Sequence, residues 1–306
     1  MKTVVFAYHN MGLAGLDALL RHGFYPTAIL THEDDPGENC WFGSVKDWAM
    51  QHGIPYYTPE NIHCPEWIEK ITTWNPDILF SFYYRKMIHL DILNIPRFGA
   101  LNLHGSLLPS YRGRCPVNWV LAKGEQKTGI TLHFMVEKPD AGDIVGQREV
   151  AIAFEDTART LYGKLCKEAE LLLDDLLPRI KTGQIPRRSQ NLALGSYYGG
   201  RRPEDGRIDW KQSAQDVYNL VRAVTDPYPG AFSLLENGEK IILWWAKPVS
   251  SSTIQRPGDV ELSGQQVLVK AGHDAIRLLD VEIQGIRLKD TQIIEYFKSG
   301  KVMKLQ

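Results

Sequence analysis

Cysteine is scarce in this chain of 306 residues, and long apolar runs are missing. The four cysteines are widely spaced and show no metal-like pairing: Cys40, Cys64, Cys115 and Cys166. This usage favours a reduced, cytoplasmic protein over a disulfide framework. No run approaches the roughly 18 apolar residues of a membrane-spanning helix. His9 and Asn10 end the first apolar run too early for a signal peptide.

An excess of charge of either sign is also missing, because 35 lysines and arginines stand against 36 aspartates and glutamates. The formal net charge of -1 argues against a wide nucleic-acid or acidic-membrane footprint, although a local basic patch is compatible with it. No group of His and Cys has zinc-ligand spacing, so we expect no metal. What is present is an ordinary globular composition, 43% hydrophobic and 23% charged, with enough chain for two domains.

Strands and helices are expected to alternate over the first part of the chain. A buried strand at 3–8 is followed by a glycine-containing turn at 9–15 and a helix that opens at Leu16. This order forms half of a dinucleotide-fold unit. The glycines do not complete the G-x-G-x-x-G pattern, so no dinucleotide cofactor is inferred. The alternation continues to a long amphipathic helix that ends near Gly183 and predicts a parallel sheet with right-handed crossovers.

The pattern changes after this helix. Residues 184–206 are rich in Arg, Gly and Ser with little periodicity, which is typical of a linker that also lines a site. One helix at 213–224 and several short strands broken by turns predict a small antiparallel barrel. We therefore expect a Rossmann-like α/β domain at 1–203, linker included, and a smaller barrel domain at 204–306.

The central stretch of the chain, from Leu101 to Arg114, reads LNLHGSLLPSYRGR. Its first residues alternate in polarity, so Asn102 and His104 are expected to project side by side from the end of a half-buried strand. The carboxyl end of a strand is the usual place for chemistry in an α/β sheet. An amide donor beside an imidazole can stabilise an oxyanion and move a proton. By itself, such a pair near a turn is more often structural.

Two motifs favour the catalytic interpretation: HGSLLPSYRG in the central stretch and VEKPDAGDIV in a second loop. Together they resemble the 10-formyltetrahydrofolate-dependent formyltransferases, and the resemblance covers nearly the whole chain. The pieces YRGRCPVNW, FSFYYR and SYYGGRR are similar to the formyltransferase domain of the bifunctional polymyxin-resistance enzymes that act on UDP-4-amino-4-deoxy-L-arabinose. The resemblance implies a Rossmann-like formyltransferase domain, an OB-like C-terminal barrel and 10-formyltetrahydrofolate as co-substrate.

The resemblance also implies three catalytic residues. Asn102 would donate an N–H to the tetrahedral oxyanion. His104 would donate a second hydrogen bond and then a proton. Asp140, in the second loop, would favour the charged form of this histidine.

Three further residues compete for these roles. Asp143 is an alternative partner for His104, but the family loop places Asp140 first. His133, on the strand before that loop, can face the same cleft, although a strand histidine is more often structural. His9, at the end of the first strand, is a further and weaker candidate.

By resemblance, the folate lies against the loop after the strand at 77–84 and against the second motif loop. The residues that would offer backbone edges to the pterin are Lys86, Met87, Ile88, Val136, Glu137, Lys138, Pro139 and Asp140. Flat heteroaromatic rings are usually held by backbone N–H and C=O groups between apolar walls. From the residues alone, 86–88 would instead be a helix start.

Arg114 bears on which amine accepts the formyl group. Methionyl-tRNA formyltransferases typically carry small residues where this chain has Arg114 and Cys115. An arginine offers a planar fork for a diphosphate. Tyr111, Arg201 and Arg202 can add to it, unless these arginines are solvated loop residues. The expected partners are a sugar nucleotide and a folate, without nucleic acid or a membrane span.

Several alternatives stay open at this point. The acceptor can be UDP-4-amino-4-deoxy-L-arabinose, another amino-sugar nucleotide or methionyl-tRNA. A folate-binding or regulatory protein with a decayed site is the non-enzymatic hypothesis, which the intact set of Asn102, His104 and Asp140 disfavours. The oligomeric state, and whether the chain is one half of a bifunctional enzyme, do not follow from the sequence.

Overall fold

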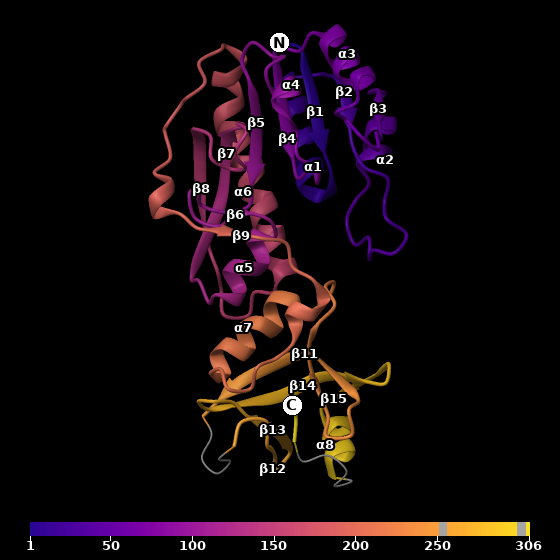
Figure 1. Cartoon of the computed structure of the whole chain (residues 1–306), viewed down its shortest axis with the longest axis vertical. Coiled ribbons are helices and arrows are strands. Elements are labelled where there is room, and N and C mark those ends of the chain that lie inside the picture. The colour runs from indigo at the N-terminus through magenta and orange to yellow at the C-terminus, as the bar shows by residue number, and fades with distance from the viewer. Residues whose placement is uncertain (251–255, 299–303) are drawn as a thin grey trace. The chain divides into compact units, whose positions relative to one another are not determined.

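The computed structural model describes residues 1–250, 256–298 and 304–306, which fall into two compact units (Figure 1). The first unit comprises residues 1–116, 127–151 and 162–199. The second comprises residues 117–126 and 152–161 and the described residues from 200 onward. Two short segments of the second unit therefore interrupt the first unit along the chain.

A seven-stranded sheet forms the centre of the first unit, in the order β3-β2-β1-β4-β5-β7-β8 (Figure 1). Its strands are β1 (Thr3–Ala7), β2 (Pro26–Leu30), β3 (Tyr56–Tyr57), β4 (Ile78–Phe82), β5 (Ala100–His104), β7 (Lys127–Phe134) and β8 (Ile144–Ala151). The first five run parallel, as predicted, but β7 runs antiparallel to both of its neighbours, β5 and β8. Residues 135–143 join β7 to β8, and a parallel crossover needs a longer connection. The α/β class is confirmed, with a mixed sheet.

Helices cover both faces of this sheet. They are α1 (His9–Arg21), α2 (Val45–Gln51), α3 (Pro65–Trp74), α4 (Leu90–Leu93) and α6 (Ala158–Lys181), which begins in the second unit, while α5 (Pro116–Ala122) leads into that unit. One face packs Ile71 of α3 and Ile92 of α4 with Phe6 and Leu79 of the sheet in one apolar core. On the opposite face α1 packs against Phe82. No helix among the described residues is long and apolar enough to cross a lipid bilayer.

Local sequence accounts for the ends of several helices. Ser44 accepts a hydrogen bond from the backbone N–H of Asp47 at 3.1 Å and caps the start of α2. Pro65 occupies the first turn of α3, where its missing N–H is not needed. Gly183, with a φ of +79°, follows the end of α6, where a residue in the left-handed region commonly ends a helix.

The start of α1 differs from the prediction. The glycines in residues 9–15 predicted a turn, but the helix already begins at His9. A Cβ atom at Gly15 would overlap the ring of Phe82, and one at Gly12 would lie 3.2 Å from the Cβ of Ala7. Both glycines therefore allow the helix to approach the sheet closely. Their role is packing, and the turn prediction was wrong.

The second unit contains α7 (Ala214–Val224) and a six-stranded antiparallel sheet in the order β10-β11-β14-β13-β12, with β15 paired to β14. Its strands are β10 (Ala231–Leu234), β11 (Lys240–Val249), β12 (Val260–Ser263), β13 (Gln266–Lys270), β14 (Ala275–Ile283) and β15 (Ile286–Lys289). Near the chain end, Lys304 bridges to Asp259 beside β12, and Leu305 bridges to Leu235 beside β10. One terminal segment thus connects both edges of the sheet. A final helix, α8 (Thr291–Lys298), was not predicted.

Replacing Gly15 by alanine tests the close packing of α1. The added Cβ would overlap the Phe82 ring, and overpacking a core typically costs about 1–3 kcal/mol. Gly163 in α6 is the matched control, because nothing lies within 4 Å of its missing Cβ. Gly163→Ala should instead stabilise the protein by about 0.5–1 kcal/mol. Urea unfolding followed by tryptophan fluorescence measures both, and equal effects of the two substitutions would contradict this packing.

Candidate active site

The central stretch begins on β5, whose last residue is His104. β5 pairs antiparallel with β7, with Asn102 opposite His133 and His104 opposite Thr131. Directly paired residues point to the same face of a sheet. These four side chains therefore share the face that carries the α3 and α4 core, to which Ala100 also contributes. The predicted alternation of Asn102 and His104 is confirmed.

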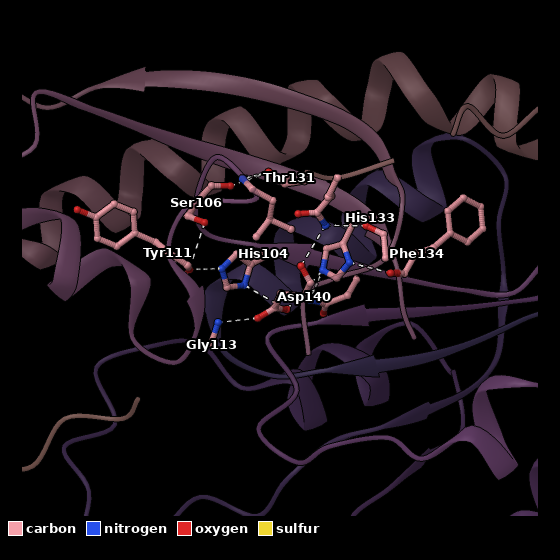
Figure 2. Close-up of polar contacts among 12 residues, drawn as sticks. His104, Ser106, Tyr111, Gly113, Thr131, His133, Phe134 and Asp140 are labelled. Carbon is pink, nitrogen blue, oxygen red and sulfur yellow. Dashed lines mark hydrogen bonds and ion pairs between the residues drawn. The ribbon is translucent and has the colours of Figure 1, made fainter. Parts of the chain in front are cut away.

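His104 is held at both ring nitrogens and is only 6% exposed. Its Nε2 donates to the backbone carbonyl of Tyr111 at 2.8 Å, and its Nδ1 lies 3.5 Å from Oδ1 of Asp140 (Figure 2). Because a backbone carbonyl can only accept, Nε2 carries a proton. A second proton, on Nδ1, would face the carboxylate. The position therefore suits the imidazolium form of His104.

Asp140 lies in the loop between β7 and β8. Its Oδ2 accepts a hydrogen bond from the backbone N–H of Gly113 at 2.8 Å, so one carboxylate joins the two motif loops. The backbone of Asp140 has a φ of +52°, which is uncommon for a residue with a Cβ. Gln190 holds this turn, because its Nε2 donates to the carbonyls of Asp140 at 3.0 Å and Gly142 at 2.6 Å.

The environment keeps Asp140 ionised. Burial raises the pKa of its carboxyl, but the charge of His104 and the hydrogen bond from the Gly113 N–H outweigh burial and hold the pKa well below its usual value. The site therefore contains a permanent negative charge beside the imidazole at neutral pH.

Residues 196–198 support the loop that follows β5. Tyr111 has a φ of +58°, which turns its carbonyl toward His104. Its backbone N–H donates to Oγ of Ser196 at 2.9 Å, and its ring stacks on Tyr198 with centres 5.0 Å apart. The short strands β6 (Arg112–Gly113) and β9 (Tyr197–Tyr198) pair between these contacts. No sequence pattern signalled that the predicted linker would hold the motif loop in this way.

Two of the competing candidates contact other residues in the structure. Oδ1 of Asp143 accepts a hydrogen bond from Oγ of Ser189 at 3.0 Å. His9 packs among aromatic rings, with its ring centre 3.9 Å from that of Phe42. Burial and the positive charge of Arg85 lower the pKa of His9 to about 3, so it is a neutral packing residue.

Residues 86–88 form a loop before α4, and the helix start that the residues alone suggested is wrong. Nζ of Lys86 donates to the backbone carbonyl of Glu60. The carbonyl of Met87 accepts from Nε2 of His63 at 3.0 Å, while the Met87 side chain is 51% exposed. The loop is therefore fixed through its backbone and presents an apolar side chain.

The residues predicted to bind a diphosphate lie in both units. Tyr111 and the exposed Arg114 belong to the first unit, and Arg201 and Arg202 to the second. The guanidinium of Arg201 lies over the ring of Trp119, 4.5 Å from its centre, within the second unit. Arg201 thus has a structural contact of its own.

Arg112 was not singled out from the sequence. It is 7% exposed, and within the described ranges its Nε and Nη1 atoms are buried without a hydrogen-bond partner. Burying a charged group without a partner is costly. A guanidinium with unpaired N–H groups beside the motif loop has the chemistry of an anion-binding group.

Comparison with known families identifies the family of this chain. A family model described as formyl transferase matches residues 22–176, half of the chain, and a model of the formyl transferase C-terminal domain matches residues 201–298. The chain belongs to the formyl transferase family. In this formyltransferase, the segment matched by the first model contains Asn102, His104 and Asp140.

Solved structures share the fold of this formyltransferase. The N-formyltransferase from Helicobacter canadensis, in complex with folinic acid and dTDP-3-aminofucose, is 20% identical, with 91% of this chain and 99% of that chain covered and a TM-score of 0.69. WlaRD, a sugar 3N-formyl transferase in the presence of dTDP and 5-N-formyl-THF, is 21% identical, with 91% and 97% covered and a TM-score of 0.68. HypX from Aquifex aeolicus, in complex with tetrahydrofolic acid, is 18% identical with a TM-score of 0.64, and the match covers 98% of this chain but 48% of HypX. This chain therefore spans about half the length of HypX.

Asp140→Asn should lower the free energy of unfolding at neutral pH. A carboxyl whose pKa falls on folding stabilises the fold above its unfolded pKa of about 3.9, and this contribution is lost as the pH falls through the folded value. The deficit of the variant should exceed about 1 kcal/mol near pH 7 and shrink below about pH 4. Urea unfolding across this range measures it, with Asp143→Asn as the control. A deficit independent of pH would contradict the ionised state of Asp140.

Proposed function

We propose that this formyltransferase transfers the formyl group of 10-formyltetrahydrofolate to the primary amine of an amino-sugar nucleotide, with UDP-4-amino-4-deoxy-L-arabinose as the acceptor. The observation that carries the proposal is the position of His104. It lies between a carbonyl that fixes one ring nitrogen and the Asp140 carboxylate, on the same strand face as Asn102. The scarcity of cysteine is in keeping with a cytoplasmic reaction.

Formyl transfer creates a tetrahedral oxyanion that the site must stabilise. The Asn102 amide is neutral and donates N–H groups, which suits a negative charge that exists only during the reaction. Because Asn102 lies on a strand, its main chain is held by the sheet. Donors that are fixed before the reaction need no reorganisation when the charge develops.

The proton balance of the reaction assigns a role to His104. The amine nitrogen forms a bond to the formyl carbon, and the bond from that carbon to the folate nitrogen breaks. The amine loses one proton and the folate nitrogen gains one. As an imidazolium, His104 donates the proton of Nδ1, since Nε2 is bound to the Tyr111 carbonyl, to the leaving nitrogen and then takes up the proton that the amine releases. Asp140 stabilises the charged form of the ring.

The residues proposed for folate binding fit a flat ring held by backbone edges. Met87 and Val136 are 51% and 43% exposed, so the two loops offer apolar surface that the chain itself leaves uncovered. The contacts of Lys86 and Met87 with neighbouring backbone and with His63 fix the first loop. Apolar walls with fixed backbone donors and acceptors are the usual setting for a heteroaromatic ligand.

Three observations support a sugar nucleotide as the acceptor. The H. canadensis relative was solved with dTDP-3-aminofucose, and WlaRD with dTDP. Arg112 and Arg114 place two guanidinium groups on the motif loop, one buried without partners for two of its nitrogens and one exposed. A diphosphate needs only a few such cations, whereas a tRNA needs a wide basic face that the balanced charge does not indicate.

Alanine substitution of the three proposed catalytic residues should reduce kcat. Loss of an oxyanion donor in Asn102→Ala costs about 10²–10³-fold, and loss of acid–base catalysis in His104→Ala about 10²–10⁴-fold. Asp140→Ala should reduce kcat by a factor in the same range, because the His104 imidazolium loses its counter-charge. Steady-state turnover of variants with a wild-type circular dichroism spectrum measures this, with Asp143→Ala as the active control. More than about a tenth of wild-type kcat in His104→Ala would refute its role.

The acceptor is identified by presenting several amines to the purified chain with 10-formyltetrahydrofolate. UDP-4-amino-4-deoxy-L-arabinose should give the highest kcat/KM, above a dTDP-linked 3-amino sugar and initiator methionyl-tRNA. In the same assay, Arg114→Ala should raise KM for the sugar nucleotide about 10-fold or more, since a hydrogen bond to a charged group contributes about 1.5–3 kcal/mol. Arg201→Ala and Arg202→Ala should have smaller effects.

Two outcomes would contradict the acceptor assignment. If Arg114→Ala weakened folate and sugar nucleotide equally, or neither, the diphosphate role of this arginine would be wrong. If the wild-type chain formylated methionyl-tRNA and no amino-sugar nucleotide, the function would be that of a methionyl-tRNA formyltransferase.

A further inference from the structure

His133 contacts the proposed oxyanion donor directly. It lies on β7, is 2% exposed, and is paired with Asn102 across the two strands. Its Nε2 is 3.1 Å from Nδ2 of Asn102, and its Nδ1 is 2.8 Å from the backbone carbonyl of Phe134 (Figure 2). Nε2 therefore faces the amide nitrogen of Asn102 and Nδ1 faces a carbonyl oxygen. These two partners restrict which ring nitrogen carries the proton.

These two contacts select one form of the ring. The Phe134 carbonyl can only accept, so Nδ1 of His133 carries the proton. The amide nitrogen of Asn102 can only donate, so Nε2 of His133 is a bare acceptor. The ring is then neutral, with its proton on Nδ1. One N–H of Asn102 is used in this bond, which leaves the second N–H for an oxyanion.

Asp140 lies equally far from the two imidazole rings. Oδ1 of Asp140 lies 3.5 Å from Nε2 of His133 and 3.5 Å from Nδ1 of His104. Both are longer than an ordinary N–H···O bond, and both approach one oxygen of a single carboxylate. One carboxylate balances one imidazolium. Only His133 has an amide nitrogen, that of Asn102, beside the ring nitrogen that faces Asp140, so we place the charge on His104.

Asn102 needs such a partner, because the terminal torsion of an asparagine side chain is broad and roughly two-fold. If the amide turned over, its carbonyl oxygen would replace the N–H group and face the developing oxyanion. The unprotonated Nε2 of His133 accepts a hydrogen bond when the Asn102 amide presents its N–H group. It repels the amide oxygen when the amide is turned over. A fixed acceptor therefore decides which end of the amide faces His133.

We propose that His133 is a positioning residue that, as the neutral Nδ1-protonated ring, holds the Asn102 amide in its oxyanion-donating orientation. This rests on the proposed function, in which Asn102 stabilises the oxyanion. His133 does not touch the reacting atoms in this proposal. It acts through the hydrogen bond to Asn102, and its own orientation depends on the bond to Phe134.

Two amide substitutions separate positioning from a structural role. His133→Gln places its amide group near the position of Nε2 and can still accept from Asn102, but it loses the Phe134 contact. His133→Asn places its amide near the position of Nδ1 and can still donate to Phe134, but it loses Asn102. Both replacements are neutral and polar, so they form a matched pair.

The proposal predicts that kcat follows the contact with Asn102. His133→Asn should lower kcat about 10²-fold, the cost expected for a misplaced catalytic group, with little change in KM for folate or amino sugar. His133→Gln should retain at least about tenfold more activity than His133→Asn. A structural role predicts the reverse order or equal losses that follow thermal stability. Equal kcat values in the two variants, or a higher kcat in His133→Asn, would overturn the proposal.

A measurement without turnover keeps this proposal distinct from the proposed function. Long-range ¹H–¹⁵N spectra of the ¹⁵N-histidine-labelled protein at neutral pH report the tautomer of each ring, and the His133 signals are those lost in both variants. A protonated Nδ1 with a bare Nε2 supports the proposal, and a protonated Nε2 overturns it. Wild-type protein that forms this tautomer but formylates no amine would refute the proposed function instead.

Discussion

The antiparallel register of β5 and β7 is the constraint on which the site depends. It places Asn102 opposite His133 on one face of the sheet and Leu103 opposite Leu132 on the other. Both leucines are buried, so a slip by one residue would exchange the polar and apolar faces of these strands. Burial of the two leucines therefore fixes the register of the strands, and the register fixes where the polar side chains lie on the other face.

The loops that complete the site are held in conformations that a free chain would rarely adopt. Tyr111 and Asp140 both have positive φ, and each is next to His104 in space. Such residues persist when surrounding contacts over-determine them, and they cluster at functional sites. Here the contacts come from Ser196 and Gln190, far along the chain. The segment between the long helix α6 and the second unit is thus part of the scaffold of the site.

The order of strands and helices was predictable because apolar runs, proline starts and glycine stops are local signals. The motifs also indicated Asn102, His104 and Asp140, whose side chains the structure gathers within one network. What the sequence could not show depends on partners distant along the chain. Gly15 is a glycine because a Cβ atom there would overlap the ring of Phe82 on β4. His133 contacts Asn102 only through the antiparallel register, whereas the predicted sheet was parallel. Two-residue strands such as β6 and β9 have no periodicity to detect.

The interleaving of the two units along the chain has a consequence for how the protein can be divided. The first family match ends at residue 176 and the second begins at residue 201, yet segments 117–126 and 152–161 belong to the second unit. Phe154, for example, stacks on Tyr218 with ring centres 4.6 Å apart. A protease or a gene split acting between the matches would leave the C-terminal fragment without these segments. The packing of the second unit would be restored only if the two fragments reassociated.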